Sequence, residues 1–163
     1  MSFKCGTKAV ILGDGGTGKT TLVERASKIT SSKNGRMTIL FELHQLKIQK
    51  QTIVVLDIGG QKQFQKAIQL IDGLFKGIQF VILCFDVSRY ASFKNLSMWL
   101  NFVKMRLPNA PIILVGTKAD KVPSVGTSEI EEFLKTNNIS QYVVTSALEG
   151  YNIQVPFEWV VAQ

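Results

Sequence analysis

The residues best suited to chemistry near the start of the chain form a glycine-rich loop at positions 13–20, which ends in Lys19 and Thr20. An apolar run at 9–12 precedes the loop, and a helix-prone stretch starts near Lys19. A turn that joins a strand to a helix points successive backbone N–H groups inward, where they and the helix N-terminus hold a polyphosphate. Lys19 is expected to reach the outer phosphates and Thr20 to ligate Mg²⁺. The predicted phosphate-binding residues are Asp14, Gly15, Gly16, Thr17, Gly18, Lys19, Thr20 and Thr21.

A second motif, at positions 57–61, follows the apolar run at 52–56. Asp57 stands at the carboxyl end of the expected strand, beside the phosphate loop, where a carboxylate can hold Mg²⁺ through water. Gly60 offers a backbone N–H to a γ-phosphate, and Gln61 can orient an attacking water. Alone this short motif is weak evidence. After a complete phosphate loop, it predicts hydrolysis of a nucleoside triphosphate.

Two further motifs point to the base of the nucleotide. Asp120 closes the TKAD sequence at 117–120, and a carboxylate accepts hydrogen bonds from both N1–H and the exocyclic amine of guanine. Adenine has no such pair of donors on that edge, so Asp120 favours GTP over ATP. After the last apolar run, a backbone N–H of residues 146–148 can meet guanine O6. The predicted base-binding residues are Thr117, Lys118, Asp120, Ser146, Ala147 and Leu148.

These motifs follow short apolar runs that alternate with helical segments, a pattern typical of an α/β fold with a mostly parallel sheet. The runs lie at 9–12, 52–56, 80–85, 112–115 and 142–144. Residues 40–48 alternate apolar and polar side chains, which predicts a one-sided edge strand that turns at 49–51 into the next run. The polar stretch at 30–36 is typical of a loop.

The helical segments carry their own signals. Phe93 begins a stripe of apolar residues that repeats every three or four positions and stops before Pro108. Ser128 and Glu131 match a capping box at the start of a further helix. Pro156 suits the first turn of a last, short helix.

The composition of the chain bounds its class. Its 163 residues, 45% of them hydrophobic, suit one domain over residues 1–163. The net charge of +7 favours anionic partners, but the lysines are scattered, as on a solvated surface. Cys5 and Cys84 predict no disulfide framework, which favours the cytosol. No signal segment, long apolar span or lipidation motif is recognised, so we expect a soluble, cytoplasmic protein without a stable membrane anchor.

The four motifs occur in the order and spacing of the Ras-superfamily small GTPases, which the chain resembles over essentially its whole length. This resemblance implies an α/β fold of the P-loop NTPase type. It would be a G domain with a six-stranded, mostly parallel sheet, one antiparallel edge strand and about five flanking helices. The resemblance also implies a switch threonine, at Thr38, that engages Mg²⁺ and the γ-phosphate. The implied metal ligands are Thr20, Thr38 and Asp57, and the implied catalytic residues are Gln61, Lys19 and Thr38.

Within the superfamily the chain looks most like Ran, with Rab as a close second. The loop sequence GDGGTGKTT and the Tyr151-Asn152 pair ahead of Pro156 resemble the Ran pattern. The long, acidic C-terminal extension of Ran is absent, so a role in nuclear transport is not implied.

Two positions depart from the family pattern, and a third offers a candidate arginine for hydrolysis. Ser31 replaces an aromatic residue that packs on the guanine, and Thr117 stands where asparagine is commoner. Arg36 lies two residues before Thr38, where an arginine of the same chain could fold back and stabilise charge on the γ-phosphate. A solvated or partner-facing arginine is the favoured interpretation.

The resemblance implies a switch that binds GTP or GDP with Mg²⁺ and hydrolyses GTP to GDP and phosphate. An effector would recognise its GTP-ordered loops, with GTPase-activating and exchange proteins as further partners. We expect a monomer and no DNA partner. The alternative is a GTP-binding interaction module with negligible hydrolysis, whose basic surface holds an acidic protein or RNA; Gln61 counts against it. A small-molecule kinase is a weaker third option, since Asp120 would then lack a purpose.

The remaining distinctive side chains have structural interpretations. His44 is expected to make a surface or effector-facing contact rather than to act as a catalytic base. Cys84 is expected to fill the core, and Trp99 and Trp159 to pack. With one histidine and no cysteine cluster, a protein-built zinc site is implausible.

Overall fold

The computed structural model describes residues 6–30, 34–38, 41–59 and 72–163. A seven-stranded sheet runs through the molecule in the order β2-β3-β4-β1-β5-β6-β7. The strands are β1 (Thr7–Leu12), β2 (Asn34–Thr38), β3 (Phe41–Ile48), β4 (Gln51–Ile58), β5 (Phe80–Asp86), β6 (Ile112–Thr117) and β7 (Gln141–Val144). The helices within the described residues are α1 (Lys19–Thr30), α3 (Tyr90–Lys94), α4 (Leu96–Arg106), α5 (Thr127–Asn137) and α6 (Val155–Val161), with a 3₁₀ turn η1 (Asp72–Phe75).

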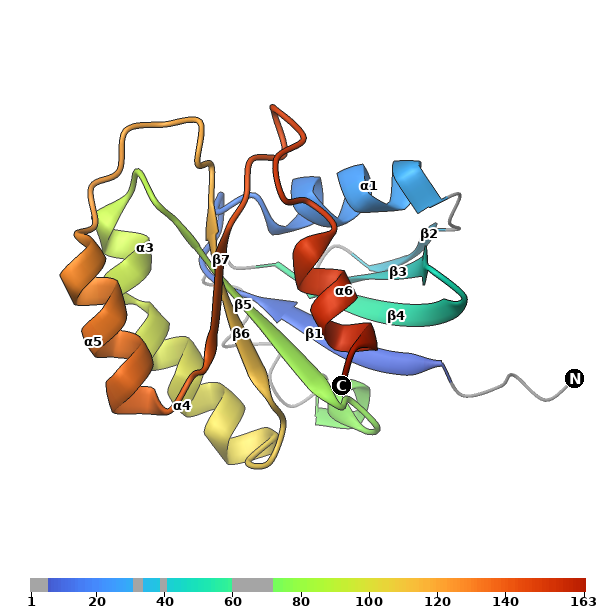
Figure 1. The fold of residues 1–163 in the computed structure, drawn as a ribbon. Helices are drawn as coiled ribbons and strands as arrows, with labels where there is room; N and C mark the ends of the chain where they lie inside the picture. Colours follow the sequence, from blue (N-terminus) through green and yellow to red (C-terminus); the bar gives the residue numbers. More distant parts are fainter. Residues whose placement is uncertain (1–5, 31–33, 39–40, 60–71) are drawn as a thin grey trace, which may run out of the picture.

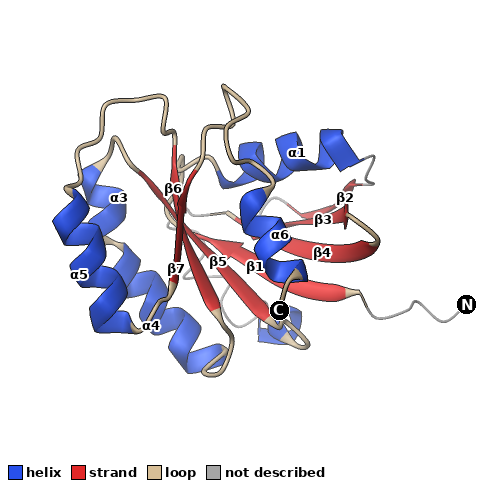
Figure 2. Ribbon diagram, viewed as in Figure 1, coloured by secondary structure: helices blue, strands red, loops and turns tan. Residues whose placement is uncertain are grey.

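Helices cover both faces of the sheet. Figures 1 and 2 show α1 and α6 on one face and α3, α4 and α5 on the other. The central strands supply apolar side chains to both layers, because Val10 and Leu12 of β1 point to one core while Ala9 and Ile11 point to the other. Strands buried on both faces therefore appear in the sequence as continuous apolar runs. No helix in the described part of the chain is long and apolar enough to cross a bilayer.

The predicted α/β fold with a mostly parallel sheet is confirmed. β1 pairs in parallel with β4 and β5, and β5, β6 and β7 continue the parallel order. The alternating segment forms β3, antiparallel to β4 as expected. The sheet has a further strand, however, because Asn34–Thr38 pairs antiparallel with β3 and becomes the edge. Part of this segment was expected to be loop. Backbone pairing with β3 outweighs its weak intrinsic strand preference.

The helix predictions hold with two corrections. The stripe that starts at Phe93 divides into α3 and α4, and α4 ends at Arg106, before Pro108. Pro156 lies in the first turn of α6, as predicted. The capping box at Ser128 and Glu131 is wrong by two residues, since α5 begins at Thr127 and Glu129 Oε2 accepts the backbone N–H of Gly126 at 3.1 Å.

The topology gathers the motifs at one edge of the sheet. The carboxyl ends of parallel neighbouring strands lie at the same edge, where ligands of open α/β sheets bind. The phosphate loop follows β1, Asp57 lies near the end of β4, Asp86 ends β5, and Thr117 ends β6. Residues 145–148 follow β7. Segments far apart in the sequence thus contribute to one site.

Candidate functional site

The phosphate loop has a backbone that depends on its glycines. Gly13, Gly16 and Gly18 have φ values of 143°, 73° and 86°, which side chains rarely adopt. A Cβ on Gly13 would also collide with the backbone carbonyl oxygen of Cys84 in β5 beneath the loop. The loop is therefore tightly seated on the sheet. Because glycines have no side chain, a ligand can come close to the backbone N–H groups of the loop.

Lys19 lies inside the loop rather than in solvent. Its side chain is 5% exposed, and Nζ donates hydrogen bonds of 2.8 Å to the carbonyl oxygens of Gly13 and Asp14. Burial lowers the pKa of Lys19, because the loop offers its ammonium little solvent. An anionic ligand beside Nζ would stabilise that charge. The predicted phosphate-binding role of Lys19 fits this environment.

Thr20 and Asp57 meet next to the loop, as a shared metal site requires. Thr20 Oγ1 donates a 2.5 Å hydrogen bond to Asp57 Oδ2, while Oδ1 is buried and has no hydrogen-bond partner among the described residues. Burial raises the pKa of Asp57. A buried carboxylate oxygen without a donor calls for a cation or a water beside it. Oxygen ligands of this kind suit Mg²⁺, which binds through few carboxylates together with waters and phosphates.

A pocket of about 210 Å³ lies between the phosphate loop and the carboxyl ends of β6 and β7. It brings together both predicted base motifs and the start of α1. Its lining residues are Gly18, Thr21, Leu22, Thr117, Lys118, Asp120, Lys121, Thr145, Ala147 and Leu148.

The carboxylate of Asp120 is held in place within this pocket. Ser146 Oγ donates a 2.6 Å hydrogen bond to Asp120 Oδ1 and in turn accepts the backbone N–H of Glu149 at 3.1 Å. Arg25 Nε, on α1, donates to the carbonyl oxygen of Ala147 at 2.9 Å. The predicted base-binding loop is therefore tied to α1, the helix that starts at the phosphate loop.

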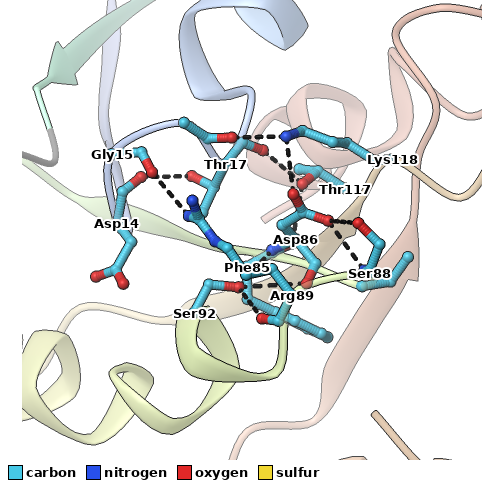
Figure 3. A network of polar contacts seen from close by, with 12 residues as sticks. Asp14, Gly15, Thr17, Phe85, Asp86, Ser88, Arg89, Ser92, Thr117 and Lys118 are labelled. Carbon is cyan, nitrogen blue, oxygen red and sulfur yellow. Dashed lines mark hydrogen bonds and ion pairs between the residues drawn. The ribbon is translucent and has the colours of Figure 1, made fainter. Parts of the chain in front are cut away.

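Thr117 and Lys118 connect the base motif directly to the phosphate loop (Figure 3). Thr117 Oγ1 lies 2.5 Å from the carbonyl oxygen of Thr17 and 2.9 Å from that of Phe85. Lys118 Nζ donates to the carbonyl oxygen of Gly16 and to Asp86 Oδ2, both at 2.7 Å. Thr117 therefore makes the link to the phosphate loop, although asparagine is commoner at this position. The predicted base and phosphate sites are therefore joined by hydrogen bonds.

Asp86 is a site residue that the sequence motifs do not include. Burial alone would raise its pKa, but hydrogen bonds from Lys118 and Ser88 hold the pKa of Asp86 below its ordinary value. Ser88 contributes both its backbone N–H, at 2.9 Å, and its hydroxyl, at 2.6 Å. An ionised Asp86 keeps Lys118 directed toward the loop. Its position at the end of a predicted strand was the one signal available.

The side chain of Asp14 is held by residues far along the chain, while its predicted role in phosphate binding stays a prediction. Its carboxylate accepts hydrogen bonds from Asn95 Nδ2 at 2.7 Å and Trp99 Nε1 at 2.8 Å. Trp99 is buried and packs edge-on against Phe102, as expected, but it also holds the phosphate loop. Arg89 contributes a second contact from outside the motifs, because Nη2 donates to the carbonyl oxygen of Gly15 at 2.7 Å.

The sequence model of the Ras family matches residues 8–163. The chain belongs to the Ras family of small GTPases. A relative, the Ras-related protein RABA1h of Arabidopsis thaliana, is 31% identical over an alignment of 163 positions that covers 96% of this chain and 73% of the relative. This likeness supports a Rab-like small GTPase that binds GTP. The resemblance to Ran stays an interpretation of the sequence.

The geometry of this small GTPase overturns the expectation for His44. The residue is fully buried rather than at the surface, and Nε2 lies 3.6 Å from Glu42 Oε2. His44 lies on the same face of β3 as Leu46 and Ile48. The core that these two residues join also contains side chains of α1. The period-two alternation of a strand places residue 44 on this covered face. Cys84 is buried, as predicted, and burial raises the pKa of its thiol to about 12.

Other predicted site residues are only partly covered by the structure. Gly60, Gln61 and Ser31 lie outside the described residues, so their roles stay predictions. Thr38 ends β2 and pairs with Phe41 through the backbone, and the position of its side chain is not described. Trp159 packs edge-on against Phe80 with ring centroids 5.8 Å apart, as expected of a packing residue.

Proposed function

We propose that this chain is a molecular switch that binds GTP with Mg²⁺, hydrolyses it to GDP and phosphate, and is recognised by a partner in its GTP state. The observation that carries the proposal is the link between Asp120 and the phosphate loop. Ser146 orients the Asp120 carboxylate, while neighbouring Thr117 and Lys118 donate to loop carbonyls. A guanine selector and a polyphosphate site are thus held in one rigid arrangement.

The residues of the site divide the chemistry among them. Lys19 and the loop N–H groups would bind the phosphate oxygens and neutralise their charge. Thr20 and Asp57 would hold Mg²⁺, which supplies further neutralisation of charge on the transferred phosphoryl group. Gln61 is proposed to orient the water that attacks the γ-phosphorus in line with the leaving oxygen. Thr38 is proposed to complete the contacts to the metal and the γ-phosphate.

Two measurements test the proposal. Titration calorimetry should show far tighter binding of GTP and GDP than of ATP, because adenine cannot satisfy the Asp120 carboxylate. Single-turnover release of phosphate from GTP should then be detectable and should require Mg²⁺. Comparable affinity for ATP would contradict the base assignment, and this outcome would leave the phosphate site in place.

The second candidate is a GTP-binding interaction module with negligible hydrolysis. The net charge of +7 favours it, since an acidic protein or RNA would bind such a surface. Phosphate release separates the two candidates because both predict GTP binding. Affinity capture on protein loaded with a GTP analogue or with GDP tests the effector, since a switch retains its partner in one state alone.

A further inference from the structure

The outer side of the phosphate loop carries three side-chain donors from elsewhere in the chain. The carbonyl oxygens of Gly15, Gly16 and Thr17 follow one another along the loop. Arg89 donates to the first at 2.7 Å, Lys118 to the second at 2.7 Å, and Thr117 to the third at 2.5 Å. Figure 3 shows Arg89, Lys118 and Thr117 converging on the loop. Each donor therefore fixes one peptide plane of the loop.

Fixing a carbonyl oxygen also fixes the N–H group of the next residue. The peptide unit is planar and trans, so its C=O and N–H point in opposite directions. When the Gly15 carbonyl is held on the outer side, the N–H of Gly16 faces the opposite side, where a phosphate lies in such loops. Glycine peptides rotate at low cost, so these planes have little resistance of their own. External donors supply the missing restraint.

Of these three donors, Arg89 is the one that lies outside the nucleotide-binding motifs. Its backbone is well anchored: its N–H donates to the carbonyl of Asp86 at 3.0 Å, and its own carbonyl accepts Ser92 Oγ at 2.7 Å. Nη1 lies 3.5 Å from the position that a Cβ on Gly16 would occupy. The guanidinium therefore lies along the Gly15-Gly16 backbone. A Cβ on Gly16 would meet the guanidinium at an ordinary van der Waals distance.

Arg89 also brings a permanent charge to the loop. A guanidinium stays protonated at every accessible pH, and a charged donor polarises the peptide group to which it binds. Burial lowers the pKa of Lys19, and the positive charge of Arg89 adds to this effect. Phosphate oxygens placed at Lys19 would be attracted by both cations.

We propose that Arg89 is a positioning residue for the polyphosphate, because it holds the Gly15-Gly16 peptide with the Gly16 N–H facing the ligand. The inference rests on the proposed function and deepens it, since it concerns the same phosphate site. Arg89 acts on the phosphates through the loop, whereas Asp120 acts on the base. Its removal therefore affects ligands according to the phosphates they carry.

The test compares Arg89→Ala and Arg89→Lys with wild type in affinity for GDP and for GMP. Arg89→Ala should weaken GDP binding about tenfold, the low end for a hydrogen bond to a charged group, since the guanidinium is exposed. GMP has no outer phosphate, so its affinity should change by less than about twofold. Arg89→Lys keeps a charged donor and should recover most of the GDP affinity.

Lys50→Ala is the matched control, because it removes one positive charge from the exposed turn between β3 and β4. It should leave both affinities unchanged, and thermal unfolding should show all variants folded. Unchanged GDP affinity in Arg89→Ala, or equal loss for GDP and GMP, would overturn the inference. Failure of wild type to bind GDP would instead overturn the proposed function.

Discussion

The indole Nε1 of Trp99 donates a 2.8 Å hydrogen bond to Oδ1 of Asp14, so helix α4 holds a side chain of the phosphate loop. Asn95 occupies the second carboxylate oxygen of Asp14 at 2.7 Å. The loop is thus restrained from two directions, by α4 through the Asp14 side chain and by Arg89, Lys118 and Thr117 through backbone carbonyls. These contacts restrain the conformation of the loop, which reduces the entropy that ordering the loop costs when a nucleotide binds.

Trp99→Phe should loosen the phosphate loop without removing the aromatic packing. The lost hydrogen bond to a carboxylate should lower the free energy of unfolding by about 1–3 kcal/mol. GDP release, followed with a fluorescent analogue, should become faster. Trp159→Phe is the control, since Trp159 makes a similar edge-on contact with Phe80 but lies outside the site. Equal release rates in the two variants would show that Asp14 needs no support from α4.

Asp120→Asn should change the base preference of the site. The substitution replaces an acceptor by a donor. The affinity for xanthine nucleotides should therefore rise, and the affinity for guanine nucleotides should fall at least about tenfold, or ~1.4 kcal/mol. Ser146→Ala removes the 2.6 Å hydrogen bond to Asp120 and should weaken GDP binding by a smaller factor. Calorimetry with GDP, XDP and ADP measures both. A variant that still prefers guanine would contradict the role of Asp120.

Asp86→Asn should alter the pH dependence of the unfolding free energy. Burial opposes ionisation, but hydrogen bonds from Lys118 and Ser88 hold the pKa of Asp86 below its ordinary value of 3.8. Ionised Asp86 therefore stabilises the folded state above pH 3.8, and this contribution is lost as the pH falls through the lower pKa of the folded state.

Urea unfolding at several pH values measures the effect. The difference in unfolding free energy between wild type and Asp86→Asn should be largest near neutral pH and should shrink below pH 3.8. Glu131→Gln, at an exposed position of α5, is the control for removing a carboxylate. A difference that stays constant down to strongly acidic pH would show that Asp86 acts through packing instead.

Contiguous motifs were predictable from the sequence because their residue types are tied to one local geometry. The loop at 13–20 and the TKAD sequence each imply a backbone shape and a ligand, and the structure places both where the parallel strands end. β2 could not be predicted, since Asn34-Gly35-Arg36 has neither apolar alternation nor β-branched residues. Its pairing with β3 is a property of the folded sheet.

Long-range side-chain contacts were the least predictable part of the site. Trp99 and Asp14 are 85 residues apart, and Arg89 and Gly15 are 74 apart. A tryptophan beside an apolar stripe is correctly interpreted as packing, and nothing in its sequence context reveals the acceptor of its N–H. The burial of His44 was missed for a related reason. The alternation of β3 was recognised, but the coverage of that face by α1 depends on the whole fold.

Ser31→Phe should slow nucleotide release. The sequence interpretation is that Ser31 stands where relatives place an aromatic residue on the guanine, and base–aromatic stacking is worth about 1–3 kcal/mol in single-stranded nucleic acids. Release of fluorescent GDP should therefore be roughly 5- to 150-fold slower in Ser31→Phe than in wild type. Ser31→Leu adds apolar area without a ring and should have a smaller effect. Unchanged release in Ser31→Phe would contradict the stacking interpretation.

Gln61→Leu and Arg36→Ala together identify the groups on which hydrolysis depends. Arg36 in the edge strand β2 pairs with Glu42 of β3 through the backbone. From the sequence, we expect a partner-facing or solvated arginine rather than one acting in cis. Arg36→Ala should then leave the single-turnover rate within about threefold of wild type, whereas Gln61→Leu should slow it at least about tenfold, or ~1.4 kcal/mol of barrier. GTP affinity should be nearly unchanged in both, because neither residue is expected to contribute ground-state binding. A tenfold loss in Arg36→Ala would assign the arginine to the γ-phosphate.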